Sequence, residues 1–367
     1  MFIQKLAFLL TLCSFLIVHG VRDVQLSMQE EKTALDKEFQ QLQKPTIKTI
    51  QDELEDTYDC VDFYKQPAFD HPLLKNHTFY PEMKPSSTSE NSLLACNRFM
   101  NNMKLKDGGC PKGTVPIRRI NKDEFYQIKK FTKEYSRYNN NALQPLPGTH
   151  IAIVQTNSDP STTTYYGVGG ELNVYDLSIK PSQYSSGEFI IQNGDDRIKV
   201  GWTAGQSHCF NALCPGFVHT KGDVPIDGYF SPTSKRGAEP SFFDLRIHQD
   251  ANTGHWWLEV CGIPIGFWPK EIFSTMSTSA TYVAVGGEVY SPPNQPLPPM
   301  GNGYYPVNDI TRSAYCTNFV VLNQNLTPIN PENTETLSDD YHYGVYDEGI
   351  TKHMGRVVYF GGTTMWK

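Results

Sequence analysis

Apolar and polar positions alternate in short segments along most of the chain after residue 148, and turn residues separate these segments. Segments of this kind predict β-strands. Many short strands at such spacing indicate a mainly β fold, an antiparallel two-sheet β-sandwich. The predicted strands are residues 150–155, 165–175, 189–192, 198–202, 216–220, 243–248, 256–261, 282–290, 315–322 and 356–360.

Helical spacing of apolar residues marks two N-terminal segments instead. We predict an amphipathic helix within residues 21–57 and a second helix over residues 122–137. Residues 58–120 read as loop-rich, and residues 138–148, rich in Asn and Pro, read as a linker. In the β-rich half, residues 269–276 are the helical candidate.

The first twenty residues have the pattern of a secretory signal peptide. Lys5 precedes the apolar run 6–18, and Val18 and Gly20 suit a signal-peptidase site. We therefore expect a secreted, extracellular protein. The run is too short to span a bilayer, and no second apolar stretch of about 20 residues predicts a membrane anchor. The net charge of −7 includes no basic stripe, which argues against a nucleic-acid partner.

The cysteines indicate an oxidising compartment. Of eight cysteines, Cys13 lies in the apolar N-terminal run, which leaves seven. Cys209 and Cys214 have histidines nearby, but their spacing fits no familiar zinc pattern, so a disulfide is favoured over a metal site. Asn76 and Asn325 begin N-glycosylation sequons, which we expect on exposed loops.

The segment Thr281–Tyr290 carries the most informative carboxylate, Glu288. In a strand, alternate side chains face opposite ways. One face is aliphatic core, whereas the face with Glu288 carries glycine and resembles the floor of a cleft. The core face holds Val283, Val285 and Val289, and the cleft face holds Ala284, Gly286, Glu288 and Tyr290. The sequence contains no Gly-x-Ser-x-Gly elbow, His-Glu-x-x-His pair or phosphate-binding glycine loop.

Two groups of motifs together extend over nearly the whole chain. The first group is Asp59–His77 and Gly109–Arg119. The second group is Tyr165-Tyr-Gly167, Val200-Gly-Trp202, Cys209–Phe217, Trp256-Trp-Leu258, Gly286-Gly-Glu288 and Tyr359-Phe-Gly-Gly362. These motifs resemble the plant neprosin family, in which the first group looks like the activation segment and the second like the peptidase domain. The resemblance implies a signal peptide over 1–20, an activation segment over 21–147 and a β-sandwich glutamic peptidase over 148–367.

The family resemblance implies an endopeptidase that cuts after proline with two glutamates and no cofactor. The implied partners are proline-containing peptides and the chain's own activation segment. Glu288 matches the second glutamate, but the first position is Lys199 in Ile198-Lys-Val-Gly-Trp202. An ammonium beside a carboxylate forms an ion pair that stabilises both charged forms. We therefore predict a Lys199–Glu288 ion pair and an incomplete dyad.

A second departure from the family follows Trp202. About twenty residues that would help to build strands and the cleft wall are absent before the Cys209 motif. Two residues are candidates for a substitute carboxylate in the cleft. Glu171 lies on the polar face of residues 169–175, and Glu188 begins the strand just before the altered one. Catalytic geometry tolerates errors of only about 1 Å or less, so such replacement is demanding.

The resemblance also implies two disulfides, Cys60–Cys110 and Cys209–Cys214. Cys96, Cys261 and Cys316 have no assigned family counterpart. Since Cys261 and Cys316 both lie in predicted strands, they are candidates to pair with each other and to leave Cys96 unpaired or intermolecular.

Three functions are compatible with these residues. The first is a prolyl endopeptidase with weak or altered activity. The second is a pseudopeptidase that binds proline-rich secreted or cell-wall polypeptides, and the third is an inert gene product. Turnover, binding without turnover, and failure to fold or to be secreted distinguish the three.

Overall fold

The structure is a computed structural model, and it describes residues 29–52, 55–88, 94–138, 147–157, 159–180, 182–205, 211–213, 215–338 and 341–363. The predicted signal peptide, most of the linker, Cys209 and Cys214 lie outside these residues. Within the described part, no helix is both long and apolar enough to cross a membrane.

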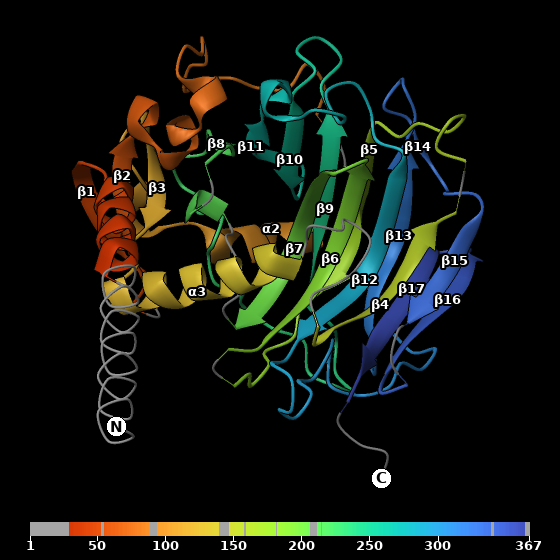
Figure 1. Cartoon of the computed structure of the whole chain (residues 1–367). Coiled ribbons are helices and arrows are strands. Elements are labelled where there is room, and N and C mark those ends of the chain that lie inside the picture. Colours follow the sequence, from red (N-terminus) through yellow and green to blue (C-terminus); the bar gives the residue numbers. More distant parts are fainter. Residues whose placement is uncertain are drawn as a thin grey trace, which may run out of the picture.

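Two antiparallel sheets form a β-sandwich, which confirms the predicted fold class (Figure 1). One sheet has five strands in the order β15-β4-β12-β6-β7: β15 (Thr334–Ser338), β4 (Thr149–Thr156), β12 (Tyr282–Tyr290), β6 (Tyr184–Asn193) and β7 (Asp196–Gly205). The other has nine strands, with the path β16-β17-β13-β5-β9-β10-β11-β8 and β14 paired to β13. These are β16 (Tyr343–Thr351), β17 (Gly355–Gly362), β13 (Ala314–Leu322), β5 (Gly167–Asn173), β9 (Phe242–Gln249), β10 (Trp256–Val260), β11 (Ile263–Trp268), β8 (Val218–His219) and β14 (Pro328–Ile329).

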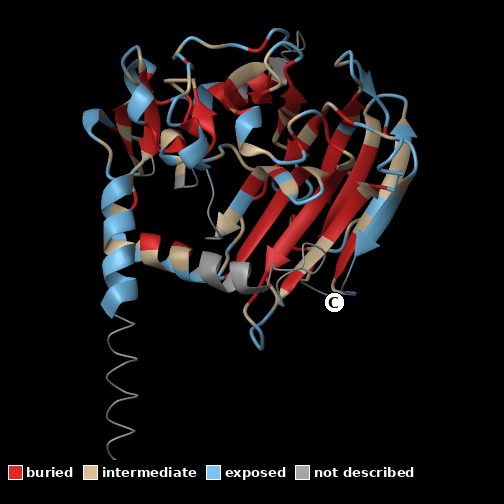
Figure 2. Ribbon diagram, turned by 45° about the horizontal axis from the view of Figure 1, so that its top comes forward, coloured by how far each residue is buried: buried red, intermediate tan, exposed pale blue. Residues whose placement is uncertain are grey.

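The main core lies between the sheets, where the buried strands of Figure 2 face one another. The valines of β12 belong to this core, together with Phe189 and Trp202 of the neighbouring strands. Ala284 belongs to a separate small cluster with Ile153 and Ile190, on the other face of the five-stranded sheet. The alternation predicted for residues 281–290 is therefore confirmed.

The N-terminal region is more ordered than its sequence pattern predicts. A small antiparallel sheet contains β1 (Thr46–Gln51), β2 (Thr57–Asp62) and β3 (Thr114–Arg118). The helical elements are residues 29–42, α2 (Leu94–Met103), α3 (Lys122–Tyr138) and the short 3₁₀ turns η1 (Phe63–Lys65), η2 (Pro67–Asp70), η3 (Pro72–Leu74) and η4 (Lys106–Gly108).

One prediction for this region needs correction. The helix predicted within residues 21–57 is present over residues 29–42, and β1 begins shortly afterwards and pairs with β2. Residues 58–120 are not simply loop, since β2 pairs with β3 across more than fifty residues of chain. Pairing over such a distance leaves no local periodicity to read. The helix predicted over residues 122–137 is confirmed by α3.

The sandwich half also differs from its prediction at a few places. Residues 269–276 form only the short 3₁₀ turn η6 (Lys270–Ile272), because the Asp196 carboxylate accepts hydrogen bonds from the backbone N–H groups of Thr275 and Met276. A further short turn, η5 (Asn211–Leu213), follows β7. The strands β11, β14, β15 and β16 were not predicted from the sequence pattern.

Aromatic side chains fix the N-terminal region to the outer face of β8, β10 and β11. Phe79 meets the rings of His255 and Phe267 edge-on, at centroid distances of 5.2 and 5.1 Å. The buried Gln66 side chain accepts a hydrogen bond from the His219 N–H and donates one to the His219 carbonyl. The N-terminal region thus packs on the nine-stranded sheet as part of one continuous structure.

Two disulfides occur among the described cysteines. Cys60–Cys110 closes the N-terminal sheet, and it is the pair that the family resemblance implies. Cys96 of α2 is bonded to Cys261 at the end of β10, and Cys316 is a buried free thiol. The suggested Cys261–Cys316 pair is therefore wrong. Strands β5 and β9 separate β13 from β10, which places the two cysteines about 14 Å apart across the sheet, beyond the reach of a disulfide.

The Cys96–Cys261 bond predicts that the N-terminal region stays attached after linker cleavage. A protein cut within residues 139–147 should run as one species on a denaturing gel without reductant and as two species with reductant. The Cys96→Ser variant should give two species under both conditions. Two separate species from the linker-cleaved native protein without reductant would contradict the Cys96–Cys261 bond.

Candidate functional site

Three neighbouring strands bring the candidate residues to one face of the five-stranded sheet. The middle one of these three strands is β6, between β12 and β7. On β12, Glu288 lies opposite Ser186 of β6, and Gly286 lies opposite Glu188. On the other side of β6, Ile190 lies opposite Lys199 of β7. Directly opposed residues point to the same face, so Glu188, Lys199 and Glu288 share the face turned away from the main core.

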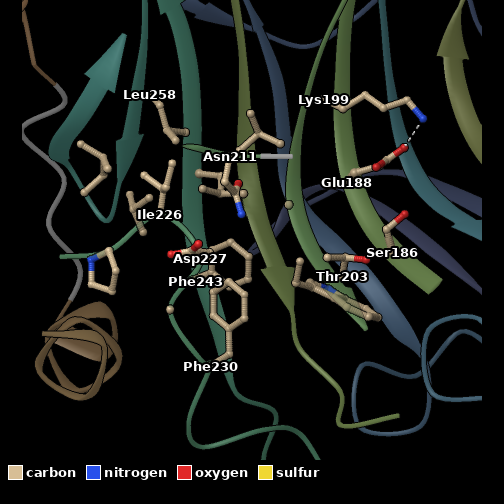
Figure 3. A pocket seen from close by; sticks show the side chains of 18 of the residues that line it. Ser186, Glu188, Lys199, Thr203, Asn211, Ile226, Asp227, Phe230, Phe243 and Leu258 are labelled. Carbon is tan, nitrogen blue, oxygen red and sulfur yellow. Dashed lines mark ion pairs between the residues drawn. The ribbon is translucent and has the colours of Figure 1, made fainter. Parts of the chain in front are cut away.

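Lys199 contacts both glutamates (Figure 3 draws its pair with Glu188). Its Nζ lies 2.6 Å from Glu288 Oε2 and 2.9 Å from Glu188 Oε1. The predicted Lys199–Glu288 ion pair is therefore confirmed. The contact with Glu188 makes a three-residue cluster, with one ammonium between two carboxylates.

Glycines flank Glu188 on both neighbouring strands. A Cβ atom at Gly201 would lie 2.0 Å from the Gly187 carbonyl oxygen, and one at Gly286 would lie 2.2 Å from the Ala152 carbonyl oxygen. Neither position accepts a side chain, because the contacting atoms are backbone. The two positions directly opposite Glu188 on β12 and β7 therefore carry no side chain.

The cluster is largely withdrawn from solvent. The side chains of Lys199, Glu188 and Glu288 retain 12, 7 and 11% of their exposure. Burial raises the pKa of Glu188 above its usual range, and the nearby Glu288 carboxylate raises it further, whereas Lys199 opposes the rise. Two ionised carboxylates would carry a charge of −2 against the +1 of Lys199. The raised pKa of Glu188 favours its neutral form, which reduces this excess of negative charge.

Tyr184 is a site residue that the sequence reasoning missed. Its hydroxyl donates a hydrogen bond of 2.5 Å to Glu288 Oε1 and is buried with it. The predicted strand began at Phe189, whereas β6 begins at Tyr184. The alternation of Tyr184, Ser186 and Glu188 was the available signal, because these residues share one face of a strand.

The second substitute carboxylate, Glu171, lies elsewhere. It belongs to β5 of the nine-stranded sheet, where its carboxylate accepts a hydrogen bond from Thr317. The hypothesis that Glu171 reaches the cleft is therefore wrong, whereas Glu188 is in contact with Lys199. No group of three or more His, Cys, Asp or Glu side chains in the described ranges is placed to hold a metal ion. Asn76 and Asn325 are exposed, as expected of glycosylation sites.

A cavity of about 860 Å³ adjoins β7 (Figure 3). Ser186, Glu188 and Lys199 line one part of it. Phe243 and Leu258 of the nine-stranded sheet line another part. The cavity therefore reaches from the charged cluster to the space between the two sheets.

Comparison with protein families accounts for both parts of the chain. A sequence model described as Neprosin matches residues 181–363, and one described as Neprosin activation peptide matches residues 49–160. The chain belongs to the neprosin family. In this neprosin-family chain the first match contains β6, β7 and β12, and hence all three members of the charged cluster.

Two solved structures resemble the neprosin-family chain at low similarity. One is SCP-B, a member of the Eqolisin family of peptidases, in a complex with the tripeptide Ala-Ile-His. The other is Scytalido-glutamic peptidase with a peptide-based transition state analogue. Each has 10% identity, a TM-score of 0.31, and coverage of 59% of this chain and 98% of the other.

Removal of the Lys199 charge should destabilise the neprosin-family fold in a pH-dependent way. Glu188 has a raised pKa in the folded chain, so stability is present at low pH and is lost as the pH rises through the carboxyl range. Without the opposing ammonium this loss grows. In urea unfolding, Lys199→Met should cost about 3–5 kcal/mol at pH 7 and clearly less at pH 4.

The matched control is Arg197→Met, which removes a positive charge from the same face of β7. Arg197 donates to Gln192 at an exposed position. Its replacement should change the free energy of unfolding by no more than about 0.5 kcal/mol. An equal loss for Lys199→Met at both pH values would contradict the charge argument.

Proposed function

We propose that this chain is a secreted pseudopeptidase of the neprosin family, which binds proline-containing peptides and does not hydrolyse them. The observation that carries the proposal is the position of Lys199 Nζ between Glu288 and Glu188. Family membership and a peptidase-like sandwich support the peptide as ligand. Loss of hydrolysis is the part that depends on Lys199.

The chemistry of a two-glutamate mechanism explains why Lys199 blocks it. One carboxylate must accept a proton from the attacking water, while the other, protonated, must donate to the peptide carbonyl oxygen. An ammonium has no lone pair with which to accept a proton. Lys199 also fills the space beside Glu288 Oε2, and Tyr184 occupies Oε1. Both oxygens of Glu288 are thus already engaged.

Opening the cluster for a substrate water would be costly. Separating one partner from a buried ion pair costs about 3–5 kcal/mol, because a buried charge is left uncompensated. Peptide binding on the same face requires no such separation. The geometry therefore favours binding over turnover.

A residual endopeptidase is the second candidate, and Glu188 is the observation that favours it. Its carboxyl group lies within 2.9 Å of Lys199, and its pKa is raised by burial. In acid, Glu188 would be the protonated donor and Glu288 the acceptor, with Lys199 displaced. This candidate predicts cleavage after proline that disappears in Glu188→Gln.

Secretion to the extracellular space, as in the apoplast or cell wall, is part of the proposal. The apolar N-terminal run and the Cys60–Cys110 and Cys96–Cys261 disulfides support it, because disulfides persist in oxidising compartments. The N-terminal region of the chain, matched by the activation-peptide family, is proposed as the chain's own regulatory partner.

Turnover of a proline-containing fluorogenic peptide between about pH 3 and 7 tests the pseudopeptidase assignment. The native protein should be silent. The Lys199→Glu variant, which restores two facing carboxyl groups, should gain at least about 10²-fold over that background. The Lys199→Glu, Glu288→Gln double variant is the control and should be silent again.

Peptide binding is measured separately by fluorescence polarisation with the same proline-containing sequence. Saturable binding without turnover supports the proposal. Native turnover that Glu288→Gln abolishes would overturn the pseudopeptidase, and the Glu188→Gln variant then tests the second candidate. Absence of any binding would overturn the peptide-binding role.

A further inference from the structure

The two sheets of the sandwich differ in width on one side. The five-stranded sheet ends at β7, which lies over β9, whereas the nine-stranded sheet continues through β10, β11 and β8 (Figure 1). The position beside β7 and opposite β10 and β11 is the position that a sixth strand would take. The 860 Å³ cavity occupies this position.

The wall of the cavity toward the nine-stranded sheet is apolar. It consists of side chains that face the sandwich interior from β9, β10, β11 and the segment before β8. They are Phe243, Leu245, Leu258, Val260, Ile265 and Phe217. Exposed residues such as Thr203 and Tyr229 also line the cavity, so it opens to solvent. A cleft of this size with an apolar wall is typical of a binding site.

The β7 edge differs from two other sheet edges in the described chain. At the far edge of the same sheet, β15 is exposed along nearly its whole length. The edge strand β8 has two residues and is covered by the N-terminal region. Proteins usually shorten or cover their edge strands, because an open edge accepts further strands. In contrast, β7 is ten residues long and adjoins an apolar cavity.

Charge at the N-terminal side of the cavity adds a specificity element. Arg118 is surrounded by Glu124, Asp56 and Asp227, and its guanidinium lies 3.6 Å from Asp227 Oδ2 and 3.9 Å from Asp56 Oδ1. All four residues line the cavity. Asp227 Oδ1 is buried without a hydrogen-bond partner among the described groups. Three carboxyl groups around one guanidinium leave an excess of negative charge, which complements a basic side chain.

We propose that the β7 edge and the apolar cavity form an acceptor site for an extended peptide strand of another protein. The strand would continue the five-stranded sheet through backbone hydrogen bonds with β7. Its alternate side chains would be apolar and would pack on Leu258, Val260 and Ile265. A lysine or arginine at one end would meet the Asp227 cluster.

The acceptor site adjoins the peptide-binding face proposed above, because Glu188 and Lys199 line another part of the same cavity, but it selects a different ligand. Proline has no N–H group and is excluded from the interior of a paired strand, so this site selects against proline-rich peptides. A proline-rich peptide therefore should not replace a strand-forming ligand in its backbone pairing with the β7 edge. Failure of either binding function leaves the other measurable.

Fluorescence polarisation of the full chain with a labelled peptide of alternating valine and threonine, carrying a lysine at each end, tests the acceptor site. The peptide should bind saturably. A matched peptide with N-methyl groups on alternate amides should bind at least about tenfold more weakly, because it lacks the backbone donors of one edge. A benzophenone-bearing version should crosslink to β7, β10 or β11, which requires no variant of the protein.

Protein variants then separate the two parts of the site. Leu258→Trp should weaken binding at least about tenfold, because the larger ring fills the cavity beside the apolar wall. Leu337→Trp on β15 is the matched control at the opposite edge and should leave the affinity unchanged. Asp227→Asn should weaken binding up to about fivefold, and this loss should vanish for a peptide without lysine.

Four outcomes would overturn the proposal. Equal affinity of the N-methylated peptide would exclude strand pairing. Crosslinks confined to residues outside β7, β10 and β11 would place the peptide elsewhere. Concentration-dependent dimerisation that Leu258→Trp abolishes would assign the cavity to a second copy of the chain. Binding of neutral N-phenyl-1-naphthylamine without any peptide binding would assign it to a small apolar ligand.

Discussion

The candidate site depends on the compensation of two buried carboxylates by one ammonium. The pairing of β6 with β12 places Glu188 and Glu288 on the same face. Two carboxylates that approach the same ammonium repel each other strongly in a poorly hydrated environment. Lys199 is the cation that makes this arrangement tolerable. Under the proposed function, the same contact that permits the folded state also removes the free carboxyl pair on which hydrolysis would depend. The proposed loss of chemistry would then have the same cause as the stability of the cluster.

Much of the fold was predictable because strands report their two faces locally. The alternation around Glu288 correctly separated the core valines from the cleft face, and the lysine at position 199 correctly predicted the ion pair. The third member, Glu188, was harder to place because the start of β6 is polar and its register relative to β7 is a tertiary property. Tyr184 escaped detection for the same reason.

Cysteine pairing and the N-terminal sheet were not accessible from local pattern. Cys261 and Cys316 both lie in or beside strands, but only the order of strands in the sheet reveals that two others separate them. The pairing of β2 with β3 likewise depends on contacts distant in sequence. The unequal width of the two sheets is of this kind as well. A shortened connection after Trp202 is visible in the sequence, but the open edge beside it is visible only in three dimensions.

The disulfide between α2 and the end of β10 has a consequence for how the chain matures. Its two cysteines are 165 residues apart, so β10 must be synthesised and placed against α2 before the bond can form. If the sandwich were produced alone, Cys261 would lose its partner and would join Cys316 as an unpaired thiol in the same apolar core. The N-terminal region therefore keeps Cys261 from remaining a free thiol, and it belongs to the covalent framework of the sandwich.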